Sequence, residues 1–175
     1  MRRLTSLPGL LGLLLLAACG GPGEQQAPPP PAPLTRDAVG YFCGMIVVDH
    51  EGPKAQIHLR GQEEPLFFTS VRDAVAFTRL PDAPHDIVAF YVHDMARAQS
   101  WEHPGDEAWM EAEKAFYVIG SDRRGGMGAP EAVPFSSREA AERFVAQHGG
   151  RIVRLDGIPR DYVLGTDADE QGDAP

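Results

Sequence analysis

The alternation of apolar and polar segments predicts a chain of short β-strands interrupted by two helices. Strands are expected where an apolar run rich in β-branched or aromatic residues lies between polar or glycine-containing breaks, at 41–50, 55–59, 66–68, 87–93, 115–120, 133–135 and 152–155. The run at 41–50 is almost wholly apolar, so we predict that it is a largely buried strand.

The two helices are indicated by capping signals. Ser70 and Asp73 have the spacing of a capping box, and the apolar positions that follow keep the helical period until Pro81 ends the helix. A second capping box occupies 136–139, and its helix is expected to end at Gly149. Strand material precedes each helix, and one strand follows it.

The two helical regions resemble each other. The stretch 68–77 matches 135–144 without a gap, because both begin with Phe-Thr/Ser-Ser and carry Ala and Phe at equivalent positions. The shared order of elements predicts two ββαβ units in one compact α+β domain, with helices packed on antiparallel or mixed sheet.

Residues 1–18 have the pattern of a cleaved export signal, with two arginines before a leucine-rich stretch too short to span a bilayer comfortably. The small residues before Cys19 resemble the lipobox of bacterial lipoproteins. That resemblance implies cleavage before Cys19 and a lipid on its sulfur. Gly20, in place of an Asp at the next position, favours the outer membrane, with the domain in the periplasm.

Composition divides the rest of the chain into a linker, a domain and a tail. Residues 19–36 are proline-rich and are expected to form an extended spacer. Residues 37–165 form the predicted domain, and 166–175 are an acidic, disordered tail. The formal net charge of −9 argues against binding to nucleic acid or to anionic lipid.

Cys43 and Met45 are the strongest candidates for chemistry. The chain has two cysteines, so with Cys19 lipidated Cys43 has no disulfide partner in an oxidising compartment. In a strand, residues two apart face the same side, so the thiol and the thioether would lie together. Two soft sulfur donors suit Cu(I) or another soft metal. An inert buried thiol is the structural alternative.

Met127 and His93 are further candidate ligands. Met127 lies between glycines in a predicted loop, where no regular face exists to bury it, so its thioether is free to reach a metal held by Cys43 and Met45. His93 ends a predicted strand next to Asp94, which is a potential partner for its ring. No spacing typical of a structural zinc site or of a nucleophile elbow occurs.

Several motifs in one order resemble the NosL family, the copper-binding lipoproteins of nitrous oxide reductase maturation. They are the lipobox at Cys19, Cys-Gly-Met at 43–45, Tyr-Val-His-Asp at 91–94, Tyr-Val-Ile-Gly-Ser at 117–121, Gly-Gly-Met-Gly at 125–128 and Phe-Ser-Ser at 135–137. The resemblance covers roughly 40–153 and implies a fold similar to the ββαβ modules of organomercurial lyase.

The resemblance also implies a function. It is that of a periplasmic Cu(I) metallochaperone, not an enzyme, which works with a membrane transporter complex and supplies the copper–sulfide centre of nitrous oxide reductase. The family's ligand positions fall on Cys43, Met45 and Met127, and His93 matches a family histidine. Some relatives carry another cysteine just before this motif, where this chain has Tyr-Phe, so a site with two thiolates is not available.

Two other functions remain open at this point. The first is a periplasmic thiol enzyme related to organomercurial lyase that uses Cys43, although such chemistry usually needs a second thiol or a close carboxylate. The second is a structural lipoprotein that binds no metal.

Overall fold

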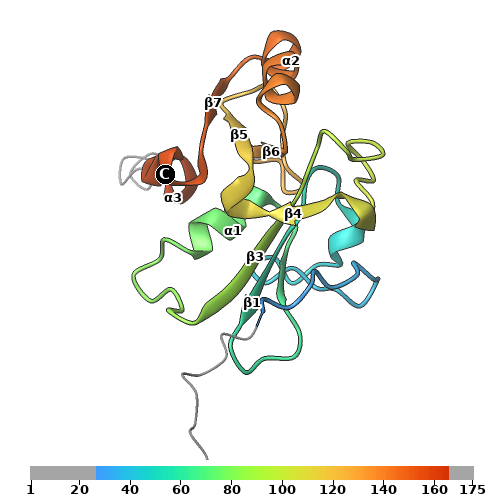
Figure 1. Cartoon of the computed structure of the whole chain (residues 1–175), viewed down its shortest axis with the longest axis vertical. Helices are drawn as coiled ribbons and strands as arrows, with labels where there is room; N and C mark the ends of the chain where they lie inside the picture. The colour runs from blue at the N-terminus through green and yellow to red at the C-terminus, as the bar shows by residue number, and fades with distance from the viewer. Residues whose placement is uncertain (1–26, 166–175) are drawn as a thin grey trace, which may run out of the picture.

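The computed structural model describes residues 27–165 (Figure 1). The predicted signal peptide, the lipidation site Cys19 and the predicted tail at 166–175 lie outside the described residues. None of the helices in the described part of the chain has the length and apolar character needed to cross a membrane.

The first half of the domain is built on a four-stranded antiparallel sheet. Its elements are β1 (Ala55–Leu59), β2 (Leu66–Phe68), α1 (Val71–Phe77), β3 (Ile87–His93) and β4 (Trp109–Glu111). The strand order is β2-β1-β3-β4, so the first strand of the unit lies between the two strands that flank the helix in sequence.

The second half repeats this arrangement. Its elements are β5 (Phe116–Ile119), β6 (Val133–Phe135), α2 (Arg138–His148) and β7 (Arg151–Val153). The strand order β6-β5-β7 places the first strand in the middle again, and both pairings are antiparallel. The predicted α+β fold of two ββαβ units is therefore confirmed.

Shorter elements connect and close the units. They are α3 (Arg160–Leu164) and the 3₁₀ helices η1 (Val47–Asp49), η2 (Asp106–Ala108), η3 (Ala112–Lys114) and η4 (Leu155–Gly157). Helix α3 packs on α1 and brings the end of the described chain back to the first unit (Figure 1).

The helix caps show the same duplication. The hydroxyl of Ser70 accepts from the N–H of Asp73 at 3.4 Å, and that of Ser137 accepts from the N–H of Ala140 at 3.2 Å. The first predicted cap is confirmed. The second lies one residue later than the predicted box, because Ser137 is the N-cap of α2 and its hydroxyl accepts from the N–H of the third helical residue.

Strand β5 lies between two hydrophobic cores and contributes side chains to both. Tyr117 is fully buried in the core formed mainly by the first unit, and its neighbour Val118 is fully buried in the core under α2. Successive side chains of a strand point to opposite faces, so this one strand joins the two units.

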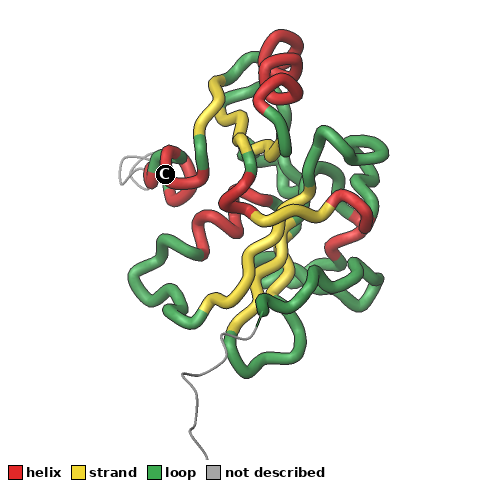
Figure 2. Tube along the Cα trace, viewed as in Figure 1, coloured by secondary structure: helices red, strands yellow, loops and turns green. Residues whose placement is uncertain are grey.

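The segment 41–50 is not the buried strand that its composition predicts. Residues 41–43 form a turn, Ile46 makes only an isolated bridge to Val39, and η1 follows immediately. Tyr41 and Phe42 remain about half exposed. Figure 2 shows the segment before β1 as loop apart from one short helical turn, η1. The apolar run at 41–50 therefore lies beside the first sheet and contributes no strand to it.

Part of the predicted spacer lies against the first sheet. The hydroxyl of Tyr91 donates to the Pro29 carbonyl oxygen at 2.7 Å. The side chain of Gln56 bonds the backbone of Ala32 twice, accepting at 2.7 Å and donating at 3.0 Å. Contact with the domain therefore begins within the proline-rich segment.

Candidate metal centre

A tight turn presents Cys43 and Met45. The N–H of Gly40 donates to the Met45 carbonyl oxygen, and the N–H of Gly44 donates to the Gly40 carbonyl oxygen, both at 2.8 Å. Gly44 has a φ of +67°, which side chains rarely adopt. Cys43 is half-buried, whereas Met45 is 39% exposed. The two sulfur-bearing residues therefore share a turn, not one face of a strand.

Gly40 makes room for the thiol. A Cβ atom at Gly40 would lie 2.6 Å from the Sγ atom of Cys43 and 3.2 Å from the Cγ2 atom of Thr69. Real Cβ atoms essentially never come within 3.0 Å of such a heavy atom, so any side chain at position 40 would displace the sulfur.

Two aromatic side chains hold the turn on the first unit. The N–H of Tyr41 donates to the Phe67 carbonyl oxygen at 2.7 Å. The ring of Tyr41 packs edge-on against Phe77 at 5.1 Å between centroids, and the ring of Phe42 packs against Phe68 at 5.7 Å. Such contacts restrict the turn that carries the thiol.

Thr69 is the polar neighbour of the thiol. Its Oγ1 atom lies 3.7 Å from the Sγ atom of Cys43, within hydrogen-bonding range for sulfur. Thr69 is buried and lies between the end of β2 and the N-cap of α1. The first ββαβ unit therefore provides both the support of the turn and the hydroxyl beside its sulfur.

The loop that carries Met127 reaches the same place from the second unit. A Cβ atom at Gly126 would lie 2.6 Å from the Cβ atom of His50 and 3.2 Å from the Thr69 carbonyl oxygen. An imidazole nitrogen of His50 is hydrogen-bonded to the Gly126 carbonyl oxygen at 3.0 Å. Met127, the next residue, is 43% exposed. Thr69 thus contacts Cys43 through its hydroxyl and lies close to the methionine loop through its carbonyl oxygen.

His93 is buried inside the protein. It is 1% exposed, its ring lies 3.9 Å from that of Trp109, and its Nδ1 atom accepts from the N–H of Lys54 at 3.2 Å. Burial, and then the nearby Lys54 charge, lower the pKa of His93 to about 3, so its ring is neutral. The Oδ1 atom of Asp94 is occupied by two backbone N–H donors at 2.9 Å each.

Strand β1 separates His93 from the thiol. Ala55 in β1 pairs with Phe68 on one side and with Val92 on the other. Thr69 and His93 follow those partners, so they lie on opposite sides of β1, about two strand spacings or ~10 Å apart. Thr69 therefore lies beside the Cys43 turn and near the Met127 loop, whereas His93 follows the strand on the other side of β1.

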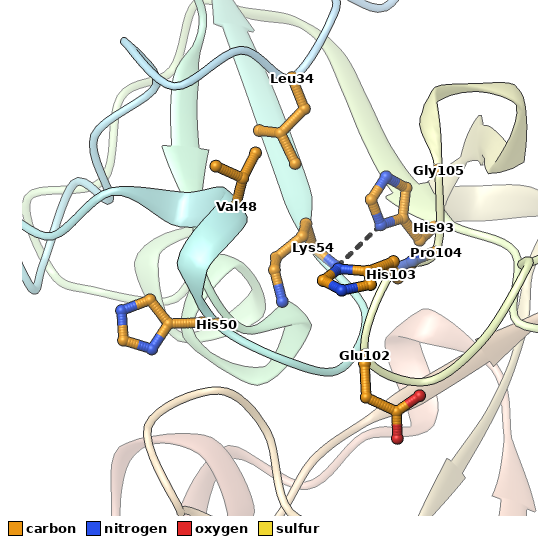
Figure 3. Close-up of a pocket in the computed structure, with 9 residues that line it drawn as sticks. All are labelled: Leu34, Val48, His50, Lys54, His93, Glu102, His103, Pro104 and Gly105. Atoms are coloured by element: carbon orange, nitrogen blue, oxygen red, sulfur yellow. Dashed lines mark hydrogen bonds between the residues drawn. The ribbon is translucent and has the colours of Figure 1, made fainter.

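A small pocket lies on the His93 side (Figure 3). It has a volume of about 160 Å³ and is lined by His50, His93, His103 and Lys54 among others, but by none of the sulfur-bearing candidates. The Nζ atom of Lys54 donates to two backbone carbonyl oxygens at 2.6 and 2.7 Å, and burial lowers its pKa to about 8.

No group of three or more His, Cys, Asp and Glu side chains within residues 27–165 is arranged to hold a metal ion. A site at Cys43 would therefore depend on the methionine sulfurs. Such a site lies on an exposed surface rather than in the pocket.

Sequence reasoning missed the residues that assemble this surface. Gly40, Thr69 and Gly126 carry no metal-binding signature, and His50 has no pairing at a ligand spacing. The repeated Phe-Thr/Ser-Ser pattern includes Thr69, but it indicates the start of a helix and not a metal site. Their roles depend on contacts between segments distant in the sequence.

The fold is that of a small α+β protein of paired ββαβ units, with a half-buried thiol at Cys43 and exposed methionines at Met45 and Met127. The chain belongs to the NosL family, whose model matches residues 31–163. This confirms the resemblance drawn from the motifs.

Named relatives agree with this assignment. The copper-binding lipoprotein NosL of Achromobacter cycloclastes is 49% identical over 153 residues, which cover 87% of this chain and 78% of that protein. The copper-binding lipoprotein NosL of Stutzerimonas stutzeri is 34% identical, with 85% and 78% covered. The crystal structure of the copper chaperone NosL from Shewanella denitrificans matches with a TM-score of 0.70 at 32% identity, covering 75% of this chain and 98% of that one.

Proposed function

We propose that this protein is a Cu(I) metallochaperone that binds one copper ion with Cys43, Met45 and Met127. It is anchored through a lipid on Cys19 and lies in the periplasm at the outer membrane. It supplies copper for the copper–sulfide centre of nitrous oxide reductase and works together with the membrane transporter complex of that maturation system. We leave His93 out of the proposed ligand set because β1 lies between it and Thr69.

One observation carries the proposal: Cys43 and Met127 are 84 positions apart, yet the Cys43 turn and the Met127 loop both lie beside Thr69. A thiolate and two thioethers are soft ligands, and soft ligands select Cu(I). The names of the relatives support copper and a lipoprotein. The oxidation state, the reductase and the outer membrane rest on the family resemblance.

The proposed ligands favour transfer over storage. On binding, the Cys43 thiol loses its proton and the thiolate forms the copper–sulfur bond. The thioethers are uncharged, so the site carries less negative charge than a pair of thiolates would. Met45 and Met127 are exposed, so an acceptor can replace them one at a time while Cys43 still holds the ion.

Metal binding is tested by anaerobic Cu(I) titration against a competing chelator. We expect Cys43→Ser to lose about 100-fold or more in affinity, because it removes the anionic ligand, and Met127→Leu to lose about tenfold. Met95→Leu is the matched control, since Met95 packs against the core under α2 and lies outside the proposed site. Equal affinity of the wild type and Cys43→Ser would overturn the proposal.

Delivery is tested in cells that make nitrous oxide reductase. A strain with Cys43→Ser in place of the wild-type protein should yield reductase depleted in the copper–sulfide centre, measured by copper content and by its absorption spectrum. A strain with Met95→Leu should yield a filled centre. A filled centre in both strains would exclude the reductase as the destination.

The thiol-enzyme alternative is not favoured. The relatives are named as copper-binding proteins and a copper chaperone. The polar side-chain partner of the Cys43 sulfur is a threonine hydroxyl, which is not a base able to activate a nucleophile.

A further inference from the structure

Glu131 is the fully buried carboxyl of this domain that lies at the base of the methionine loop. It stands immediately before the buried Ala132 that leads into β6, and its exposed fraction is 0%. Its Oε1 atom accepts from the N–H of Arg72 and from the N–H of Ala132, both at 2.8 Å. One oxygen therefore ties the first turn of α1 in the first unit to the entry of β6 in the second.

The other oxygen of this carboxyl faces the methionine loop. A Cβ atom at Gly125 would overlap with the Oε2 atom of Glu131 and would lie 3.4 Å from the Oγ atom of Ser70. The loop closes above this contact, because the N–H of Gly125 donates to the Ala129 carbonyl oxygen at 2.9 Å and that of Gly128 to Gly125 at 2.8 Å. The turn that carries Met127 thus rests directly on the carboxyl.

The same carboxyl is one short step from the residue beside the thiol. Glu131 accepts a hydrogen bond from the backbone N–H of Arg72. Arg72 is three residues after Thr69, and the Thr69 hydroxyl contacts Cys43. The chain around Glu131 is held as well, since the hydroxyl of Tyr162 donates to the Glu131 carbonyl oxygen at 2.8 Å. Glu131 therefore lies against the methionine loop at Gly125 and binds the first turn of α1, three residues after Thr69.

We propose that Glu131 is a positioning residue of the metal centre, whose buried carboxyl sets the placement of the Met127 loop relative to the Cys43 turn. The inference rests on the proposed function, because it assigns a role within that same site. Glu131 does not touch the metal. It acts through Gly125 on one side and through the Arg72 backbone on the other.

Two substitutions of Glu131 should differ in their effect on Cu(I) affinity. Glu131→Gln keeps the shape and an oxygen that accepts both N–H groups, so it should bind Cu(I) within about threefold of the wild type. Glu131→Ala leaves the N–H groups of Arg72 and Ala132 without their acceptor and opens space beneath the loop. Its Cu(I) affinity should fall up to about tenfold, which is the loss expected for Met127→Leu and the lower end of the range for residues that orient metal ligands.

A double-mutant cycle with Met127→Leu separates positioning from general destabilisation. If Glu131 acts by placing Met127, Glu131→Ala should weaken binding in the wild type and add little in the Met127→Leu background. Copper K-edge absorption should show one sulfur fewer in Glu131→Ala than in Glu131→Gln. A full effect of Glu131→Ala in both backgrounds, or an unchanged sulfur count, would overturn the inference.

Gly125→Ala provides a second route in case Glu131→Ala does not fold. Its methyl group would push the loop off the carboxyl while both N–H bonds to Oε1 remain, so the loss of one sulfur ligand is expected again. Wild-type affinity in Gly125→Ala would count against the inference. Cys43→Ser in the same titration identifies the failing step: if it binds copper normally the proposed function itself fails, and if only the Glu131 and Gly125 variants bind normally the positioning role fails.

Discussion

The Sγ atom of Cys43 lies 3.7 Å from the Oγ1 atom of Thr69, although 26 residues separate them in the chain. Thr69 belongs to the junction between β2 and α1, whereas Cys43 belongs to a turn that precedes both. The contact joins the proposed metal ligand to the rigid part of the first ββαβ unit. It also makes the hydroxyl available to the sulfur when the thiol gives up its proton.

Thr69→Val should weaken Cu(I) binding by about 1 kcal/mol, or roughly fivefold, because it removes one hydrogen bond to the thiolate and keeps the side-chain shape. Thr69→Ser should bind as the wild type does. The control is Thr78→Val, which removes a hydroxyl that bonds the Val75 carbonyl oxygen away from the site. Chelator competition measures all three, and equal losses in Thr69→Val and Thr78→Val would show that the Thr69 hydroxyl has no special role.

Gly44→Ala should destabilise the fold by about 1 kcal/mol, because a side chain is strained at a φ of +67°. It should also weaken Cu(I) binding, since this glycine closes the turn between the two sulfur-bearing residues. Gly61→Ala is the matched control, with a φ of +77° and, as at Gly44, nothing within 4 Å of the added carbon.

Urea unfolding should show similar losses of stability in the two glycine variants, and copper titration should show a loss in Gly44→Ala alone. Normal copper affinity in Gly44→Ala would mean that the geometry of the turn is not needed for binding.

His93→Gln should leave Cu(I) affinity within about threefold of the wild type, because β1 lies between His93 and Thr69. Stability should respond instead. The pKa of His93 is lowered from 6.5 to about 3 by burial and by Lys54, so the unfolded chain takes up its proton first on acidification. The stability that depends on a neutral ring is complete above pH 6.5 and falls as the pH drops towards 3, by at most about 1.4 kcal/mol per pH unit.

Unfolding free energies of the wild type and His93→Gln between pH 4 and 8 check this. The advantage of the wild type should shrink on the acid side. A copper affinity at least tenfold lower in His93→Gln would return His93 to the ligand set.

The contribution of Glu131 to the free energy of unfolding should depend on pH in the opposite direction to that of His93. Burial raises the pKa of its carboxyl from 4.5 to about 7, against the lowering effect of the Arg72 and Ala132 N–H groups. The folded state therefore binds this proton more tightly than the unfolded chain, and its contribution to stability falls as the pH rises from 4.5 to 7. The total is on the order of 3 kcal/mol.

Glu131→Gln removes this titration, so its stability relative to the wild type should increase from pH 5 to pH 8 in urea unfolding. Parallel stability profiles for the two proteins would show that the carboxyl does not retain its proton on folding.

The sequence by itself determined the two main helices, the strands β1, β2, β3, β5, β6 and β7, and their order. The capping serine and aspartate at 70 and 73, the stop at Gly149 and the repeated Phe-Thr/Ser-Ser pattern are local signals, and the two ββαβ units follow from them. The sequence also selected Cys43, Met45 and Met127 as candidates, because a thiol without a partner and a methionine between glycines are visible without a fold.

Tertiary structure alone decided where those residues lie. The apolar run at 41–50 has the composition of a strand, but the positive φ of Gly44 and the packing of Tyr41 and Phe42 on the first unit make it a turn. The contacts of Thr69 with Cys43 and with Gly126, and the separation of His93 by β1, arise from strand order and loop packing. Local composition does not reveal such pairings, because the partners are distant in the chain and meet only in the folded domain.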